Sequence, residues 1–146
     1  MDDLIEVITP ETLTQKKFWR ENKHIKGTKM FQVLEEVDKI LGSYNIAWGP
    51  TGSVGFELAS GVETITNTSD LDIIARAPEI LSIDIAKNII KELSKLTIKT
   101  DVQLEVPNGS IALEEYARDN KSIMLRTING PKFVKDPWSY DEMLEE

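Results

Sequence analysis

Two runs of this sequence alternate apolar residues with acidic or amide residues, and this alternation constrains the fold more than any other feature. From Ile98 to Val106 the apolar Val102, Leu104 and Val106 stand on one face. Leu71-Asp72-Ile73 repeats the pattern directly after Asp70. Successive side chains of a strand point to opposite faces. Both runs are therefore predicted to be strands with one face in a core and a polar face outside it.

The segments around these strands have the spacing of helices or the residues of turns. Helices are predicted at 11–23, after the N-cap Thr9, and at 31–41, 54–60, 83–96 and 110–118, the last after a turn at 107–109. Short strands are predicted at 46–48, 122–127 and 132–134. Glycine and proline at 49–53 predict an irregular loop with Ser53 near a helix N-cap. This order indicates an α/β or α+β domain with a small mixed sheet and flanking helices.

Composition excludes several functional classes. The net charge of −8 disfavours DNA as a partner, because phosphate neutralisation drives that binding. The apolar runs are too short to span a membrane, and the acidic N-terminus has no signal-peptide pattern. The chain has no cysteine, so no disulfide or thiolate chemistry is available. We therefore expect a cytoplasmic protein.

The charge is unevenly distributed along the chain. Six basic residues and His24 lie between Lys16 and Lys29, with Glu21 the only acid among them, whereas residues 141–146 are mostly acidic. Two interpretations of the basic stretch stay open. It is either a solvated helix face or a surface for a polyphosphate or an acidic protein.

Three carboxylates and a Gly-Ser pair form the candidate site. Asp70 and Asp72 are predicted to share one strand face, and Asp101 to converge with them if its strand is a neighbour. Such carboxylates repel one another unless a divalent cation lies between them, and Mg²⁺ shares oxygen ligands with substrate phosphates. Gly52 and Ser53 precede a helix whose N-terminus favours an anion. The set predicts metal-dependent attack on a phosphorus centre.

Other side chains with possible chemistry have simpler interpretations. His24 is the only histidine, which excludes a Ser-His-Asp triad and a histidine-rich zinc site, and we expect it to be exposed. Glu57 and Glu63 are near the site in sequence as possible fourth ligands, but solvated carboxylates are the simpler expectation. Core positions rather than base-stacking roles are expected for the tryptophans Trp19, Trp48 and Trp138.

In this order the elements resemble the nucleotidyltransferase superfamily typified by DNA polymerase beta. Further segments resemble a narrower family, the malonate decarboxylase holo-acyl-carrier-protein synthases, which are phosphoribosyl-dephospho-CoA transferases. These segments are Trp48–Leu58, Ser69–Asp72, Asp101–Glu105, Leu125-Arg126-Thr127 with Gly130-Pro131, and Asp136-Pro137-Trp138. The resemblance covers about Thr9 to Trp138. It implies one nucleotidyltransferase-like domain over residues 1–146, with a helical lead-in at 9–43 and a catalytic core at 44–138.

The resemblance also implies a reaction. Members of the family transfer the phosphoribosyl-dephospho-CoA part of triphosphoribosyl-dephospho-CoA to a serine of an acyl carrier protein and release pyrophosphate. They carry a longer segment before the Thr-Pro-Glu region, where this chain has residues 1–8, and that segment is expected to contribute to substrate or carrier-protein binding. Two alternatives stay open: a generic small nucleotidyltransferase that moves AMP or another nucleotide, and a non-catalytic nucleotide- or partner-binding domain.

Residue roles are carried over from the resemblance at matching positions. The Mg²⁺ ligands and catalytic carboxylates would be Asp70, Asp72 and Asp101. The triphosphate would be held by Gly52 and Ser53. Arg126 would contact a phosphate, or would instead pair with a surface acid. The basic stretch between Lys16 and Lys29 is a candidate surface for the acidic carrier protein.

Overall fold

The computed structural model describes residues 9–139, so the acidic residues 141–146 lie outside the described part. Six strands form one sheet in chain order: β1 (Trp48–Thr51), β2 (Leu71–Arg76), β3 (Thr100–Val106), β4 (Gly109–Ala112), β5 (Ile123–Thr127) and β6 (Gly130–Val134). The helical elements are α1 (Pro10–Gln15), the 3-10 turn η1 (Phe18–Arg20), α2 (Lys29–Ser43), α3 (Gly52–Ser60), α4 (Ile83–Leu93) and α5 (Leu113–Ala117). None of the helices within residues 9–139 has the length and apolar character needed to span a bilayer.

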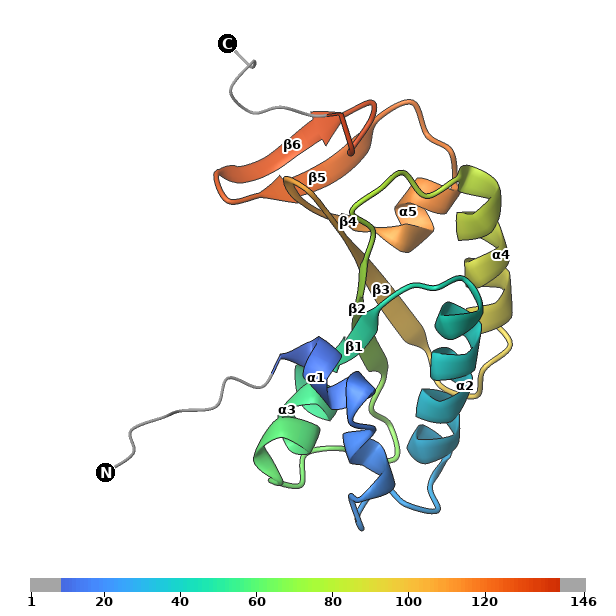
Figure 1. Cartoon of the computed structure of the whole chain (residues 1–146), viewed down its shortest axis with the longest axis vertical. Coiled ribbons are helices and arrows are strands. Elements are labelled where there is room, and N and C mark those ends of the chain that lie inside the picture. Colours follow the sequence, from blue (N-terminus) through green and yellow to red (C-terminus); the bar gives the residue numbers. More distant parts are fainter. Residues whose placement is uncertain (1–8, 140–146) are drawn as a thin grey trace.

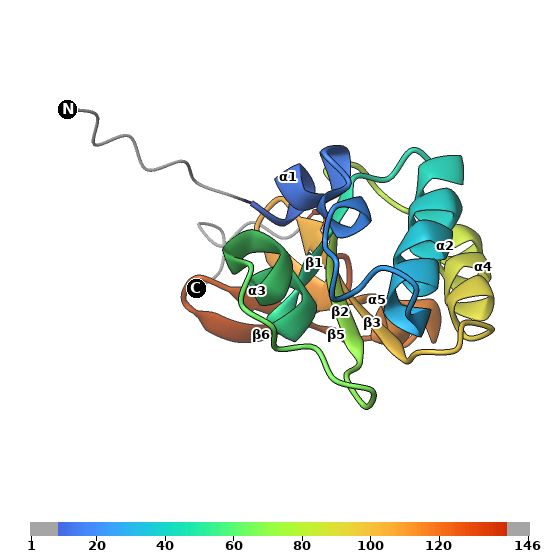
Figure 2. The ribbon, with the colours of Figure 1, turned by 90° about the horizontal axis from the view of Figure 1, so that it is seen from below.

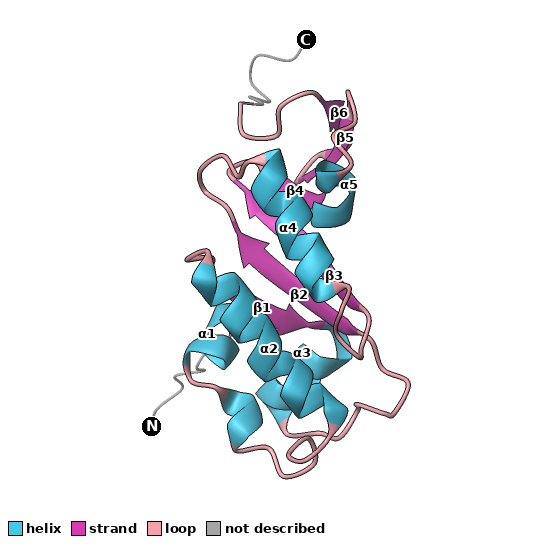
Figure 3. Ribbon diagram, turned by 90° about the vertical axis from the view of Figure 1, so that its right-hand side faces the viewer, coloured by secondary structure: helices cyan, strands magenta, loops and turns pink. Residues whose placement is uncertain are grey.

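The sheet is mixed, as predicted. Strands β2 and β3 are parallel, and every other neighbouring pair is antiparallel. Helix α4 lies between β2 and β3 in the chain and supplies the long connection that a parallel pair requires. Helices α2, α4 and α5 lie along one side of the sheet (Figures 1 and 3). From below, α1 and α3 lie on the other side of the strands from α2 and α4 (Figure 2).

The core lies between the sheet and the helices α2, α4 and α5. The apolar residues of the two predicted strands are buried: Leu71, Ile73, Val102 and Leu104 are at most 6% exposed. They pack with the apolar stripes of the helices, which include Leu34, Val37 and Leu41 of α2 and Ile89 and Leu93 of α4. The alternating pattern therefore gave the correct inward face of both strands.

The tryptophans support the core, as predicted. Trp19 and Trp48 are buried with ring centroids 5.8 Å apart, and both indole N–H groups donate to acids of α2, Glu35 and Asp38. Half-buried Trp138 donates to the carbonyl of Ala77 and packs edge-on against Tyr116. Each indole thus has a partner for its polar atom.

The predicted loop at 49–53 is wrong, because residues 49–51 form most of β1 and Gly52 and Ser53 begin helix α3. Strand β1 is the edge of the sheet and has a neighbouring strand on one side only. An edge strand tolerates proline, which lacks a backbone N–H, better than a central strand does. Gly49 is required because a Cβ there would collide with the backbone of Pro10. The close approach lets α1 pack directly on β1.

The predicted helix at 110–118 is also wrong in its first part. Ser110 is not a helix cap but lies in β4, where it pairs with Glu105 of β3 and with Arg126 of β5. A Cβ on Gly109 would collide with the carbonyl oxygen of Arg126, so the glycine permits this close pairing. Pairing from both sides overrides the local helix signal, and α5 begins only at Leu113.

The basic stretch is not one helix face. The helix predicted at 11–23 ends at Gln15, and η1 and turns follow. Three of the basic groups pair with acids of the chain: Lys17 with Asp38 at 3.0 Å, Arg20 with Glu35 at 2.7 Å and His24 with Glu57 at 2.8 Å. Lys23, Lys26 and Lys29 remain exposed. A role of this surface in binding an acidic partner stays a prediction.

The Arg20–Glu35 pair predicts a stability change with pH. Glu35 accepts hydrogen bonds from Arg20 and Trp19, and the Arg20 guanidinium lowers the pKa of Glu35 to about 2 against the opposing effect of burial. A depressed carboxyl pKa stabilises the fold above the ordinary value of 4.5, and this stabilisation disappears as the pH falls toward 2. We expect Glu35→Gln to reduce the free energy of unfolding at neutral pH by only about 1 kcal/mol, because the pair is partly exposed.

Urea unfolding of the wild type and of Glu35→Gln at neutral and acidic pH measures this difference. The two proteins should converge in stability as the pH approaches the lowered pKa of Glu35. A difference that stays constant over the whole range would contradict the assigned role of the carboxylate charge.

Candidate functional site

Asp72 and Asp101 are direct neighbours across the parallel strands β2 and β3. Their Cα atoms are register partners, and both residues are exposed. Paired residues of adjacent strands send their side chains to the same face. The residues before and after Asp72 are buried, so both carboxylates leave the face opposite the core. The two strands are adjacent, as the predicted convergence of carboxylates required.

Asp70, the third predicted carboxylate, is not a register partner of Asp72 or Asp101. Asp70 is exposed and lies immediately before β2. Among residues 9–139, no group of three His, Cys, Asp or Glu side chains is arranged so that it could hold a metal ion by itself. Like-charged carboxylates repel one another in the absence of a cation. A site that joins all three aspartates therefore remains a prediction.

Gly52 brings the start of helix α3 against Asp72. The glycine has φ of +60°, and a Cβ at this position would lie 2.8 Å from Oδ2 of Asp72. Helix α3 begins at Gly52, so Ser53 is its second residue rather than its cap. The N-cap is Thr51, and its side chain makes no capping hydrogen bond. The first-turn N–H groups beside the Asp72 carboxylate therefore form a place that favours an anion.

A groove continues along the same side of the sheet. It has a volume of ≈ 550 Å³, and its lining includes Ile74, Arg76, Glu105, Ser110 and Arg126. Ile74 is two residues beyond Asp72 on β2. Arg76 is occupied by Glu11 at 3.3 Å and Glu105 at 3.1 Å. Within the described residues Arg126 is exposed and pairs with no acid, so the alternative of a surface ion pair is not realised there.

These residues fit a hard divalent cation in their chemistry. Asp72 and Asp101 offer carboxylate oxygens on one exposed face, and the start of α3 favours phosphate beside them. Mg²⁺ is commonly held by one or two carboxylates together with substrate phosphates. The residues that would hold it are Asp72 and Asp101, with Asp70 as the further oxygen donor.

The expectation of a solvated Glu57 is wrong. Its side chain is 0% exposed, and both of its oxygens accept hydrogen bonds, so it is not available as a fourth metal ligand. His24 was predicted to be exposed, and its side chain is 35% exposed but paired with Glu57. The signal was present in the sequence, because Glu57 lies on the buried helical stripe with Val54 and Leu58.

Comparisons with known proteins identify the family to which the chain belongs. The sequence model of the family described as "Phosphoribosyl-dephospho-CoA transferase MdcG C-terminal domain" matches residues 17–137. A protein of Pseudomonas putida named phosphoribosyl-dephospho-CoA transferase is 40% identical over 111 residues, which cover 76% of this chain and 54% of that protein. The protein of the same name from Pseudomonas syringae pv. tomato is 35% identical over 136 residues, which cover 93% of this chain and 63% of that protein.

A third relative with this name, from Pseudomonas fluorescens strain Pf0-1, is 31% identical over 142 residues, which cover 97% of this chain and 66% of that protein. The chain thus spans between about half and two thirds of the length of these relatives. No solved structure matches the chain. The family match covers most of the chain, and the chain therefore belongs to the family of the C-terminal domain of phosphoribosyl-dephospho-CoA transferases.

Proposed function

We propose that this chain transfers a phosphoribosyl-dephospho-CoA group from its triphosphate precursor to a serine of an acyl carrier protein, with release of pyrophosphate. The observation that carries the proposal is the register pairing of Asp72 with Asp101, next to the start of helix α3 at Gly52. The names of the relatives support the transferred group. The triphosphate precursor, Mg²⁺ and the carrier protein are parts of the proposal.

The residues divide the work by their chemistry. The N–H groups at the start of α3 and the Ser53 hydroxyl bind the triphosphate, and Gly52 allows its oxygens to approach the backbone. If held by Asp72 and Asp101, with Asp70 as the further oxygen donor, Mg²⁺ would supply charge neutralisation on the triphosphate and on the departing pyrophosphate. Asp101 accepts the proton of the serine hydroxyl while the serine oxygen forms a bond to the α-phosphorus. The bond from that phosphorus to the bridging oxygen breaks, and pyrophosphate leaves.

The groove beyond Ile74 would receive the part of the substrate that extends past the reacting phosphate. Dephospho-CoA carries a diphosphate, and Arg126 is the groove cation without an acid partner among the described residues. A guanidinium binds phosphate oxygens through charge-assisted hydrogen bonds. Exposed Lys23, Lys26 and Lys29 are the cations available to an acidic carrier protein.

Arg126→Gln tests the groove assignment. Loss of one charge-assisted contact to a phosphate costs about 1.5 kcal/mol, so KM for the precursor should rise about tenfold while kcat changes little. Steady-state kinetics measures both constants. Arg118→Gln is the matched control, because Arg118 is an exposed arginine paired with Glu114 on α5. An unchanged KM in Arg126→Gln would remove Arg126 from the site.

Pyrophosphate release in the presence of Mg²⁺ tests the proposed reaction. Triphosphoribosyl-dephospho-CoA with apo carrier protein is compared with ATP and CTP, and mass spectrometry follows the carrier protein. Modification of the carrier protein with triphosphoribosyl-dephospho-CoA, and not with ATP or CTP, supports the proposal. Turnover only with ordinary nucleotides would identify a generic nucleotidyltransferase, and neither turnover nor Mg²⁺ binding would identify a non-catalytic domain.

A further inference from the structure

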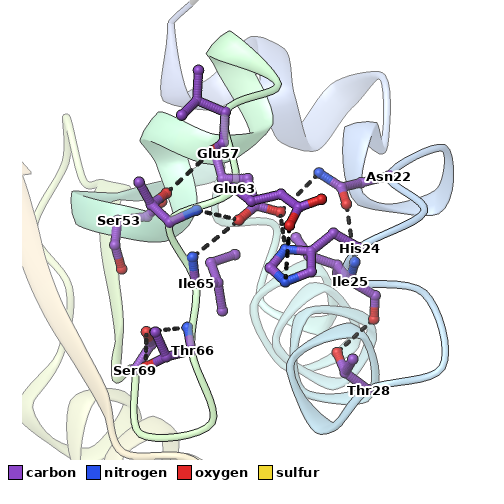
Figure 4. A network of polar contacts seen from close by, with 12 residues as sticks. Asn22, His24, Ile25, Thr28, Ser53, Glu57, Glu63, Ile65, Thr66 and Ser69 are labelled. Carbon is purple, nitrogen blue, oxygen red and sulfur yellow. Dashed lines mark hydrogen bonds and ion pairs between the residues drawn. The ribbon is translucent and has the colours of Figure 1, made fainter.

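Glu57 is a buried acid whose carboxylate joins three parts of the chain (Figure 4). Oε1 accepts the backbone N–H groups of Thr64 at 2.8 Å and Ile65 at 3.0 Å. Oε2 accepts from Nδ2 of Asn22 at 3.1 Å and lies 2.8 Å from Nδ1 of His24. A charge removed from water is tolerated when it is paired and hydrogen-bonded in this way. Burial of a carboxylate costs free energy, so we ask which parts of the structure the contacts of Glu57 hold in place.

These contacts hold the segment that leads to the candidate site. Residues 61–69 form no helix or strand, and they run directly into Asp70 and Asp72. The segment is also tied to the first turn of helix α3, because Thr64 donates its hydroxyl to the carbonyl of Ser53 at 3.1 Å. Near its end the segment closes on itself, where the Thr66 N–H donates to Oγ of Ser69 at 2.9 Å. Glu57 and the Ser53 carbonyl together therefore fix to helix α3 the segment that leads into β2.

We propose that Glu57 is a positioning residue that holds segment 61–69 against helix α3, and that its pairing with His24 makes this hold dependent on pH. The arrangement of Ser53 relative to Asp70 and Asp72 then depends on Glu57, although Glu57 touches neither aspartate in any hydrogen bond of the described chain. Only the consequence for turnover rests on the proposed transferase function.

The pH dependence has a defined sign. Burial raises the pKa of Glu57, but the N–H groups of Ile65, His24 and Thr64 outweigh burial and leave this pKa below its ordinary value of 4.5. The hydrogen bond to Glu57 raises the pKa of His24 above 6.5. The other charged groups around this pair are Glu63, 4.0 Å from Nε2 of His24, and Lys23 and Lys29, which line pockets together with His24.

The contribution of Glu57 to folding is therefore present above pH 4.5 and is lost as the pH falls through its lowered pKa. The contribution of His24 is complete below pH 6.5 and is lost as the pH rises through its raised pKa. The network is strongest between these two values. Above the pKa of His24 the hold weakens, because neutral imidazole keeps a hydrogen bond but loses the ion pair.

Amide NMR of the whole chain tests the hold without reference to turnover. In Glu57→Met both acceptors are lost, and hydrogen exchange at the Thr64 and Ile65 amides should accelerate at least about tenfold. Glu57→Gln keeps an acceptor oxygen and should retain this protection. Glu35→Gln is the matched control, since it neutralises another paired acid whose hydrogen bonds reach Trp19 and Arg20 and not segment 61–69. Unchanged exchange in Glu57→Met overturns the proposal.

A pH titration of the same amides tests the role of His24 even if Glu57→Met does not fold. The amide shifts of Thr64, Ile65 and Asp72 should move together with a midpoint above pH 6.5, and His24→Gln should abolish this step. A step that persists in His24→Gln, or one that leaves Asp72 unmoved, overturns the proposal. In the transfer assay, kcat should fall in Glu57→Met and recover in Glu57→Gln. A wild type that titrates as expected but transfers nothing would refute the proposed function alone.

Discussion

We expect that replacing Asp72 by asparagine lowers the rate of the proposed pyrophosphate release by on the order of 10³-fold and leaves the fold intact. The size follows from the loss of one charged group that stabilises a transferring phosphoryl group. The fold should survive because Asp72 is exposed and stands beside a second carboxylate, Asp101. Removal of one of two like charges relieves their repulsion, so the melting temperature should stay the same or rise.

Two measurements separate this effect from general damage. Single-turnover pyrophosphate release gives the rate, and thermal unfolding gives the stability of the same preparation. Asp84→Asn is the matched control, because Asp84 is an exposed aspartate on α4, on the other side of the sheet. Near-normal release by Asp72→Asn would place the chemistry elsewhere. An equal loss in Asp84→Asn would show that the assay reports overall charge.

Replacing Gly52 by alanine has the second-largest expected effect. A residue other than glycine at positive φ costs about 1–2 kcal/mol, and here the added Cβ also meets the carboxylate of Asp72. The carboxylate must move away from the start of α3, so transfer should fall about 10²-fold, which is the scale of a displaced catalytic group.

Gly27→Ala provides the control for backbone strain outside helix α3 and outside segment 61–69. Gly27 has φ of +85°, but a Cβ there meets nothing within 4 Å. Both variants should therefore lose similar stability in urea unfolding, and only Gly52→Ala should lose transfer. If the two variants lost transfer to the same extent, the contact between Gly52 and Asp72 would have no special role.

The sequence was sufficient for the strands that carry the aspartates and insufficient for the strands beside them. Asp72 and Asp101 stand among apolar residues of period two, and burial of those residues leaves only one side for the carboxylates. By contrast, Pro50 is in a strand because β1 is an edge, and Ser110 because neighbours pair with it on both sides. These causes are tertiary, so no local pattern contains them.

The site was predictable in its residue types but not in its exact pairing. Alternation puts Asp72 and Asp101 on polar faces, yet it does not say that these two Cα atoms are register partners. The burial of Glu57 was missed because a carboxylate is usually solvated, although its place on the helical stripe pointed inward. Its partners come from residues 22–24 and 64–65, which no short-range pattern connects to it.

The parallel pairing of β2 with β3 determines where this domain can accept insertions and deletions during evolution. A hairpin turn holds the alignment of antiparallel strands, but these two strands are joined through α4 and have no such turn. Their alignment depends on the fit of buried residues such as Ile73 and Val102. Insertion of one residue in β2 would turn Asp72 toward the core, whereas lengthening of the α4 connection would leave it in place. Insertions and deletions should therefore be tolerated in the connection through α4 but not within β2.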